Sequence, residues 1–193
     1  MSIGIASSYL LIAAIITLLM DKFATTSKIR SLLLITFACL LPIFDMPAPL
    51  YIRGAIGDLS LVSQCILAAY LLNYYVVDIS HLAKTIAKKQ FAVYVLMLAL
   101  ALYPASLGLS LIDPYEAGYA SSDWHFVLFS AACAAAIFFY RPGSQLFTFI
   151  MLASTTLFWL NALESTNYWD YLLDPVITIL ALGYLVVRLI KNK

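Results

Sequence analysis

Seven apolar segments, separated by short polar connections, constrain this chain more than any other feature of its sequence. A helix that crosses a bilayer needs roughly 20 consecutive apolar residues, with about 17 as the lower limit. The second and sixth segments are short, so each is interpreted either as a tilted member of a helix pair or as a half-span. The predicted membrane spans are residues 3–20, 29–44, 59–77, 91–112, 124–140, 145–161 and 175–190.

The composition supports this reading and narrows the fold class. Hydrophobic residues make up 64% of the 193 residues and charged residues only 11%, whereas soluble domains are about half apolar and about a quarter charged. A net charge of +1 gives no indication of a nucleic-acid partner. Because the connections are short, we expect residues 1–193 to form one all-α transmembrane domain. The start of the chain lacks the basic residues of a signal peptide, so we expect the first segment to remain in the mature protein.

The basic residues lie in alternate connections, which places them on one side of the predicted bundle. The positive-inside rule makes that side cytoplasmic, so we predict an N-terminus outside and a C-terminus inside a plasma (inner) membrane. The basic residues on this side are Lys22, Lys28, Arg30, Lys84, Lys88, Lys89, Arg141, Arg188, Lys191 and Lys193. The opposite connections carry Asp45, Asp58, Asp113, Glu116, Asp123, Glu164, Asp170 and Asp174. Arg53 is the single basic residue on that outer side.

The connection that holds Arg53, residues 42–58, is rich in proline and glycine. Its prolines favour an extended or turned path rather than a helix, and the segment could dip into the bundle as a re-entrant loop. We expect Arg53 to pair with Asp45 or Asp58, because an unpaired cation at a partly buried rim is costly. The alternative is that its planar guanidinium binds a phosphate or carboxylate.

The outer acids and aromatic residues also have structural interpretations. Asp58, Asp123 and Asp174 each precede an apolar segment, so we predict that they cap the following helices. Trp and Tyr favour the membrane interface, where the ring is in apolar surroundings and the polar tip reaches water. We therefore predict an interfacial belt made of Tyr51, Tyr115, Tyr119, Trp124, Tyr168, Trp169 and Tyr171.

Other acids on the outer side are not explained by capping. Together they could bind a divalent cation through oxygen ligands or supply a general acid and base, but no spacing matches a defined metal motif and no cofactor is indicated. His125 could carry a proton near neutral pH or simply accept a structural hydrogen bond. The candidate site residues are Asp45, Arg53, Asp58, Glu116, His125, Glu164 and Asp170.

Two functions fit these observations. The first is a small integral subunit or accessory protein of a larger membrane assembly, whose partners are the lipid bilayer and another membrane protein. The second is an enzyme that acts on a lipid-linked or headgroup substrate at the outer leaflet, with Arg53 binding the anion. No charge lies near the middle of a predicted span, which disfavours an ion-coupled transporter. Paired charges at a closed outer rim favour the subunit; a pocket with an unpaired Arg53 favours the enzyme.

Overall fold

The computed structural model describes residues 3–23, 27–82, 85–140 and 142–191, and it confirms the predicted all-α fold. Lys84, Arg141 and Lys193 lie outside the described residues. The short elements are strands β1 (Pro42–Ile43) and β2 (Met46–Pro47), and the 3-10 turns η1 (Ser80–Leu82) and η2 (Glu116–Gly118). The helices are α1 (Ile3–Phe23), α2 (Lys28–Leu40), α3 (Ala48–Ile56), α4 (Leu61–Tyr75), α5 (Thr85–Ser106), α6 (His125–Phe139), α7 (Gln145–Trp159), α8 (Trp169–Leu172) and α9 (Pro175–Lys191).

Each of the seven apolar segments contains one long helix, but the fourth helix is displaced from its predicted position. Helix α5 covers Thr85–Ser106 rather than residues 91–112. It ends early because Gly108 adopts a positive φ of 76°, a conformation that favours glycine, and the Leu109 N–H bonds back to the Pro104 carbonyl. Within the described residues, two helical stretches are long and apolar enough to cross a membrane, Gly4–Lys22 and Lys88–Ser106.

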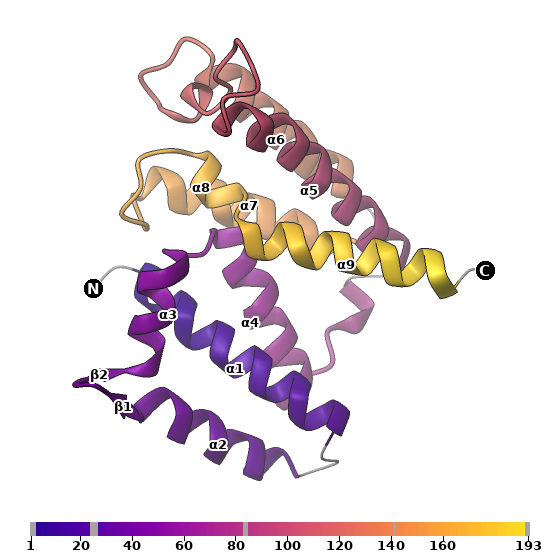
Figure 1. Cartoon of the computed structure of the whole chain (residues 1–193). Coiled ribbons are helices and arrows are strands. Elements are labelled where there is room, and N and C mark those ends of the chain that lie inside the picture. The colour runs from indigo at the N-terminus through magenta and orange to yellow at the C-terminus, as the bar shows by residue number, and fades with distance from the viewer. Residues whose placement is uncertain (1–2, 24–26, 83–84, 141, 192–193) are drawn as a thin grey trace.

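The long helices run between two ends of the molecule (Figure 1), and the connections at these two ends differ in charge. One end, which we call the acidic end, holds α3, the β1–β2 hairpin, the connection between α5 and α6, and α8. The other, which we call the basic end, holds the connections after α4 and α6 and the C-terminal end of α9. Helix α1 packs against α2, α3 and α4, and α4 also contacts α7 and α9. Helix α5 packs on α9, and α6 packs on α7.

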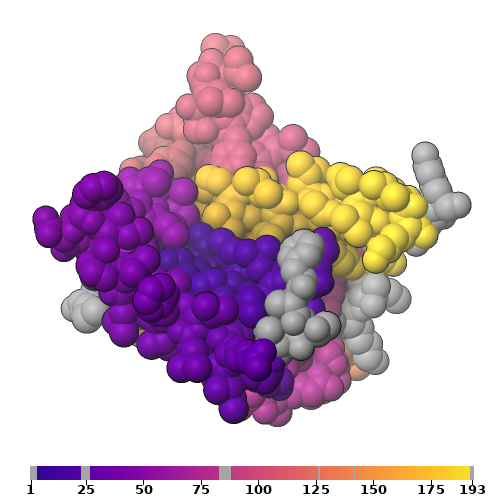
Figure 2. Space-filling model, turned by 60° about the horizontal axis from the view of Figure 1, so that its bottom comes forward, coloured from indigo at the N-terminus to yellow at the C-terminus, as the bar shows by residue number. Residues whose placement is uncertain are grey.

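Large apolar side chains point outward from several helices. On α2, Leu33, Phe37 and Leu40 are 65%, 64% and 69% exposed. Helix α9 likewise presents Ile179 and Leu189 to the outside. In Figure 2, α1 forms the surface between α2 and α3 on one side and α9 on the other. The outward faces of α2 and α9 therefore carry large apolar side chains.

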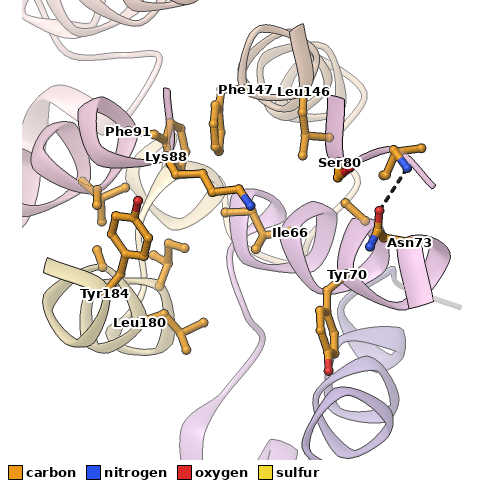
Figure 3. A pocket seen from close by; sticks show the side chains of 16 residues that line it. Ile66, Tyr70, Asn73, Ser80, Lys88, Phe91, Leu146, Phe147, Leu180 and Tyr184 are labelled. Carbon is orange, nitrogen blue, oxygen red and sulfur yellow. Dashed lines mark hydrogen bonds between the residues drawn. The ribbon is translucent and has the colours of Figure 1, made fainter. Parts of the chain in front are cut away.

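At the basic end, helices α4, α5, α7 and α9 line a cavity of about 290 Å³ (Figure 3). Ala69, Ala92 and Ala181 line it from α4, α5 and α9, and all three are buried. A methyl group fills little of the space between helices, so these three positions leave a gap that larger side chains would close.

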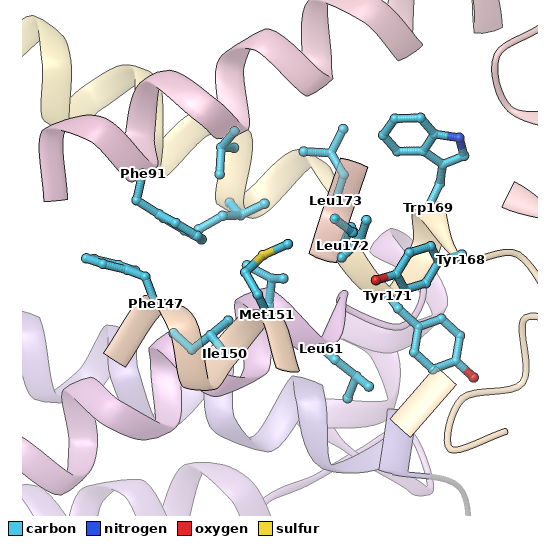
Figure 4. Packing of buried hydrophobic residues seen from close by; sticks show 14 of the residues in the cluster. Leu61, Phe91, Phe147, Ile150, Met151, Tyr168, Trp169, Tyr171, Leu172 and Leu173 are labelled. Atoms are coloured by element: carbon cyan, nitrogen blue, oxygen red, sulfur yellow. The ribbon is translucent and has the colours of Figure 1, made fainter. Parts of the chain in front are cut away.

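The main core lies beside this cavity and extends to the acidic end (Figure 4). Phe91 of α5 and Phe147 of α7 stack with ring centroids 4.4 Å apart. Tyr168 and Tyr171 are fully buried and Trp169 is 5% exposed. The predicted interfacial belt is therefore wrong for these three residues. Their polar groups have internal partners, because the Tyr168 hydroxyl lies 2.6 Å from Thr155 Oγ1 and Tyr171 accepts the Leu163 N–H at 3.0 Å.

Candidate functional site at the acidic end

Arg53 forms the centre of an ion-pair network at the acidic end. Its Nε lies 2.5 Å from Asp58 Oδ1, and its Nη2 lies 3.0 Å from Asp58 Oδ2. The same Nη2 donates to Glu164 Oε1 at 2.8 Å. The planar guanidinium thus holds two carboxylates, one of them through two parallel bonds. These hydrogen bonds, first to Asp58 and then to Glu164, raise the pKa of Arg53 above its usual range.

Helix α3 places Arg53 in this position. The segment was predicted to be extended or turned, and the prediction holds for Pro42 and Pro47, which face each other across the β1–β2 hairpin. It is wrong for residues 48–56, which form α3. Pro49 is tolerated there because it lies in the first turn, where no intrahelical partner for its nitrogen is needed. Gly57, at a φ of 74°, ends the helix and turns the chain toward Asp58.

The first turn of α1 closes over the Asp58 carboxylate. Gly4 is buried, and a Cβ built on it would overlap the carboxylate of Asp58. Only glycine therefore allows α1 to approach the ion pair this closely. The next residue, Leu59, donates its N–H to Ser7 Oγ of α1 at 3.3 Å. The position of the Asp58 carboxylate is consequently fixed by its contact with α1 as well as by its attraction to Arg53.

The capping predictions have mixed outcomes. Asp174 caps α9, because its Oδ1 accepts the Ile177 N–H at 2.9 Å. Its Oδ2 also accepts the Ser60 N–H at 2.7 Å, which ties the start of α9 to the start of α4. Asp58 does not cap α4; the cap is Ser60, whose Oγ accepts the Ser63 N–H. Asp123 does not cap α6, which begins after Trp124 without a side-chain cap.

A second network joins the connection between α5 and α6 to α8. The Tyr115 hydroxyl donates to Asp170, at 3.0 and 2.9 Å from the two carboxylate oxygens, and Ser165 Oγ donates to the same carboxylate at 2.5 Å. Asn167 Nδ2 donates to the Tyr115 carbonyl, and Trp169 Nε1 donates to the Pro114 carbonyl. Burial, followed by the bond to Asp170, raises the pKa of Tyr115 above its usual range. Its hydroxyl therefore remains a donor.

Sequence reasoning missed this second network. Tyr115 and Trp169 were interpreted only as interfacial residues, and Asn167 was not considered. Their polar groups meet across sequence separations of more than fifty residues. The only local signal was the short spacing of hydrogen-bonding residues around Asn167, where Ser165 and Trp169 bond to its backbone and side chain.

Between the two networks lies a pocket of about 420 Å³ at the acidic end. Asp58, Glu164, Asp170 and Asp174 line it, together with Tyr115. A second, more open depression shares Asp58 and Glu164 and adds Arg53. Four of the seven candidate residues therefore line these two adjoining hollows: Arg53, Asp58, Glu164 and Asp170. Each is already held by a hydrogen bond to another side chain.

The remaining three candidates, Asp45, Glu116 and His125, line neither of these two hollows. Asp45 is exposed at the tip of the hairpin with a φ of 72°. Glu116 is exposed on η2. His125 is only 8% exposed and lies among Phe158, Trp159 and Tyr168. Its Nδ1 is 3.3 Å from the Ala117 carbonyl, while its Nε2 has no hydrogen-bond partner in the described part of the chain.

The chemistry available at this end is limited by these contacts. No group of three His, Cys, Asp or Glu side chains among the described residues could hold a metal ion. The carboxylates that line the pocket accept bonds from arginine, tyrosine, serine or backbone donors, so the arrangement joins segments of the chain. Comparison with protein-family models, with curated protein sequences and with solved structures finds no match for this chain.

Proposed function

We propose that this chain is a multi-pass protein of a bacterial-type plasma (inner) membrane, with seven spans, the acidic end outside and the basic end in the cytoplasm. The alternating basic residues support this orientation. The two helical stretches that are long and apolar enough to cross a membrane are only 39% and 28% buried within the chain. The core helix of a soluble protein would be mostly buried, so these exposed apolar faces support a lipid environment.

We further propose that the protein is a small integral subunit or accessory protein of a larger membrane assembly. The observation that carries this proposal is the combination of short helices and apolar outward faces. Helix α2 has 13 residues and α4, α6 and α7 have 15 each, or about 20–22 Å at the usual helical rise. The hydrocarbon core is about 30 Å thick. Short spans are accommodated by bilayer thinning or by association with other helices.

The charges at the acidic end also support the subunit. Arg53 is held by Asp58 and Glu164, so binding an anionic headgroup would first have to displace a carboxylate. Truncating one member of such a pair leaves the other uncompensated. Arg53 in these two ion pairs therefore contributes to the stability of the acidic end.

The pocket of about 420 Å³ between the two networks gives the enzyme alternative its support. In that case Asp170 would be the best-placed acid or base, because it faces the pocket beside Tyr115. An Asp170→Asn variant separates the two functions. If it folds normally and leaves assembly intact while abolishing a headgroup-modifying activity, the enzyme proposal moves ahead.

Reporter fusions test the topology. Fusions after Lys89, Gly143 and Lys193 should report the cytoplasm, and fusions after Pro49, Tyr119 and Asn167 should report the outside. A cytoplasmic signal at Tyr119 would overturn the proposed orientation.

Purification from its own membrane in a mild detergent tests the subunit. We expect a protein partner at fixed stoichiometry, and we expect a photo-crosslinker placed at Phe37 of α2 to form one discrete adduct with it. A cross-linker at Asp45, on the exposed hairpin tip, serves as the matched control. A clean monomer without partners would overturn the subunit proposal.

A further inference from the structure

The cavity at the basic end has an apolar interior and a polar mouth. Ile66, Val95 and Ile177 line it together with the three alanines, while Lys88, Ser80 and Asn73 line it where α4 and α5 reach the basic end. Figure 3 shows the Lys88 side chain extending across the pocket between the apolar side chains. A volume of about 290 Å³ is close to the lower end of the range for ligand pockets, roughly 300 Å³.

The Lys88 ammonium has no carboxylate within salt-bridge distance among the residues that the structure describes. Two acids, Asp21 and Asp78, lie at the basic end of the molecule. Asp78 uses its Oδ1 to accept the Ser80 N–H at 2.9 Å, and hydrogen bonding with Ser80, first through its side chain and then through its backbone, lowers the pKa of Asp78. Asp21 lies at the end of α1, which does not line the cavity. Among the described residues that line the cavity, Lys88 is therefore the one that carries a charge.

Hydrogen-bond donors flank this charge. Asn73 Oδ1 accepts the Ile79 N–H at 3.0 Å, which leaves the Asn73 amide nitrogen as a donor (Figure 3). Ser80 adds a hydroxyl, and Tyr184 of α9 lines the same cavity with its own hydroxyl, which accepts a bond from Arg188 at 3.2 Å. An ammonium group with neighbouring neutral donors suits a phosphate oxygen, and an apolar cavity behind it suits a hydrocarbon chain.

We propose that this cavity binds one acyl chain of an anionic phospholipid of the inner leaflet, with the lipid phosphate against Lys88. Basic pockets between transmembrane helices on the cytoplasmic side bind anionic headgroups by this chemistry. The choice of leaflet depends on the proposed topology, whereas the binding itself can be measured in detergent. A wrong topology and a wrong lipid site would therefore fail in different experiments.

Native mass spectrometry of the purified protein, titrated with phosphatidylglycerol or phosphatidylcholine in detergent, tests the site. We expect one phosphatidylglycerol to bind in preference to phosphatidylcholine, and Lys88→Met to weaken its binding roughly fivefold. Lys89→Met is the matched control, because Lys89 is the next residue on α5 and does not line this cavity. Equal losses in Lys88→Met and Lys89→Met would overturn the site.

Filling the cavity tests the position of the acyl chain. Ala92→Phe should prevent the lipid from binding, and Ala181→Leu from the opposite helix provides a second variant if Ala92→Phe fails to fold. Inorganic phosphate at millimolar concentration should not compete with the lipid. Unchanged phosphatidylglycerol binding in a folded filling variant, or displacement of the lipid by phosphate alone, would overturn the proposal.

Discussion

The two ends of this molecule use charge in opposite ways. At the acidic end, Asp58, Asp170 and Asp174 each accept hydrogen bonds from a different element, and Arg53 links two carboxylates. At the basic end, Lys88 has no carboxylate partner among the described residues and lies beside an apolar cavity. The comparison teaches that the charges of the acidic end join elements of the fold, whereas Lys88 at the basic end is exposed and makes no ion pair with a described residue. Stability measurements at both ends can test this difference.

The largest effect is expected at Asp174. Asp174→Ala removes a helix cap, which costs about 0.5–2 kcal/mol, and leaves the Ser60 N–H without its acceptor, which costs about 1–3 kcal/mol. We expect the free energy of unfolding to fall by about 2–4 kcal/mol. Equilibrium unfolding in mixed detergent measures this change. Asp174→Asn should be intermediate, because its single carbonyl oxygen can replace only one of the two acceptors; equal stability of all three proteins would contradict the assignment.

The next effect is expected where α1 closes on Asp58. Asp58→Ala should lower the free energy of unfolding by about 1–3 kcal/mol, because Arg53 loses its two-bond partner. Gly4→Ala should cost about the same, because its methyl group displaces the Asp58 carboxylate. The double variant should be little worse than either single variant, since both remove one interaction.

Gly54→Ala is the matched control for Gly4→Ala. A Cβ at Gly54 meets no atom within 4 Å, and the residue lies inside α3. We therefore expect it to be neutral or to stabilise the protein by about 0.5–1 kcal/mol. Strict additivity of Gly4→Ala and Asp58→Ala would show that α1 does not act through the ion pair.

A smaller effect is expected for Glu164. Its side chain is 67% exposed, so its bond to Arg53 is weakened by solvent. Glu164→Gln should lower the free energy of unfolding by only about 0.2–1 kcal/mol, and the difference from the wild type should shrink in high salt. A loss as large as that of Asp58→Ala would indicate that Glu164 contributes as much as Asp58 to holding Arg53, and would contradict this expectation.

The smallest effect is expected at the basic end. Lys88→Met should change the free energy of unfolding in lipid-free detergent by no more than about 0.5 kcal/mol, because no ion pair is broken. Thermal unfolding of the two proteins side by side measures this. If Lys88→Met were as destabilising as Asp58→Ala, the contrast between the two ends would be wrong.

Local sequence patterns located the seven long helices, the fourth of them with displaced bounds, and predicted two of the contacts correctly. Each long helix is built from one apolar segment, so the position of the segment in the sequence locates the helix. The Asp174 cap and the pairing of Arg53 with Asp58 were also predicted, since both partners are near in sequence. The prediction that Asp58 caps α4 was wrong, because the Asp58 carboxylate is bonded to Arg53 and Ser60 provides the cap.

The rest of the site depends on contacts that no local pattern contains. Glu164 reaches Arg53 across 111 residues, and Gly4 meets Asp58 only after α1 and α4 pack together. Tyr168 and Tyr171 have the composition of an interfacial belt, yet the fold of α8 buries them. Helix α3 was missed because three prolines outweighed its other residues in the prediction, although only Pro49 lies inside the helix and it lies in the first turn.

The two hydrogen bonds that the Asp174 carboxylate accepts have a consequence for the electrostatics of the bundle. Helices α4 and α9 are in contact, and the N-terminal ends of both donate a backbone N–H to Asp174. Their macrodipoles therefore point the same way, and their two partly positive ends lie together, an arrangement that is repulsive on its own. A single carboxylate between the two ends offsets both. The parallel pair can then persist without an ionised group near the middle of either helix, where a bilayer would tolerate charge least.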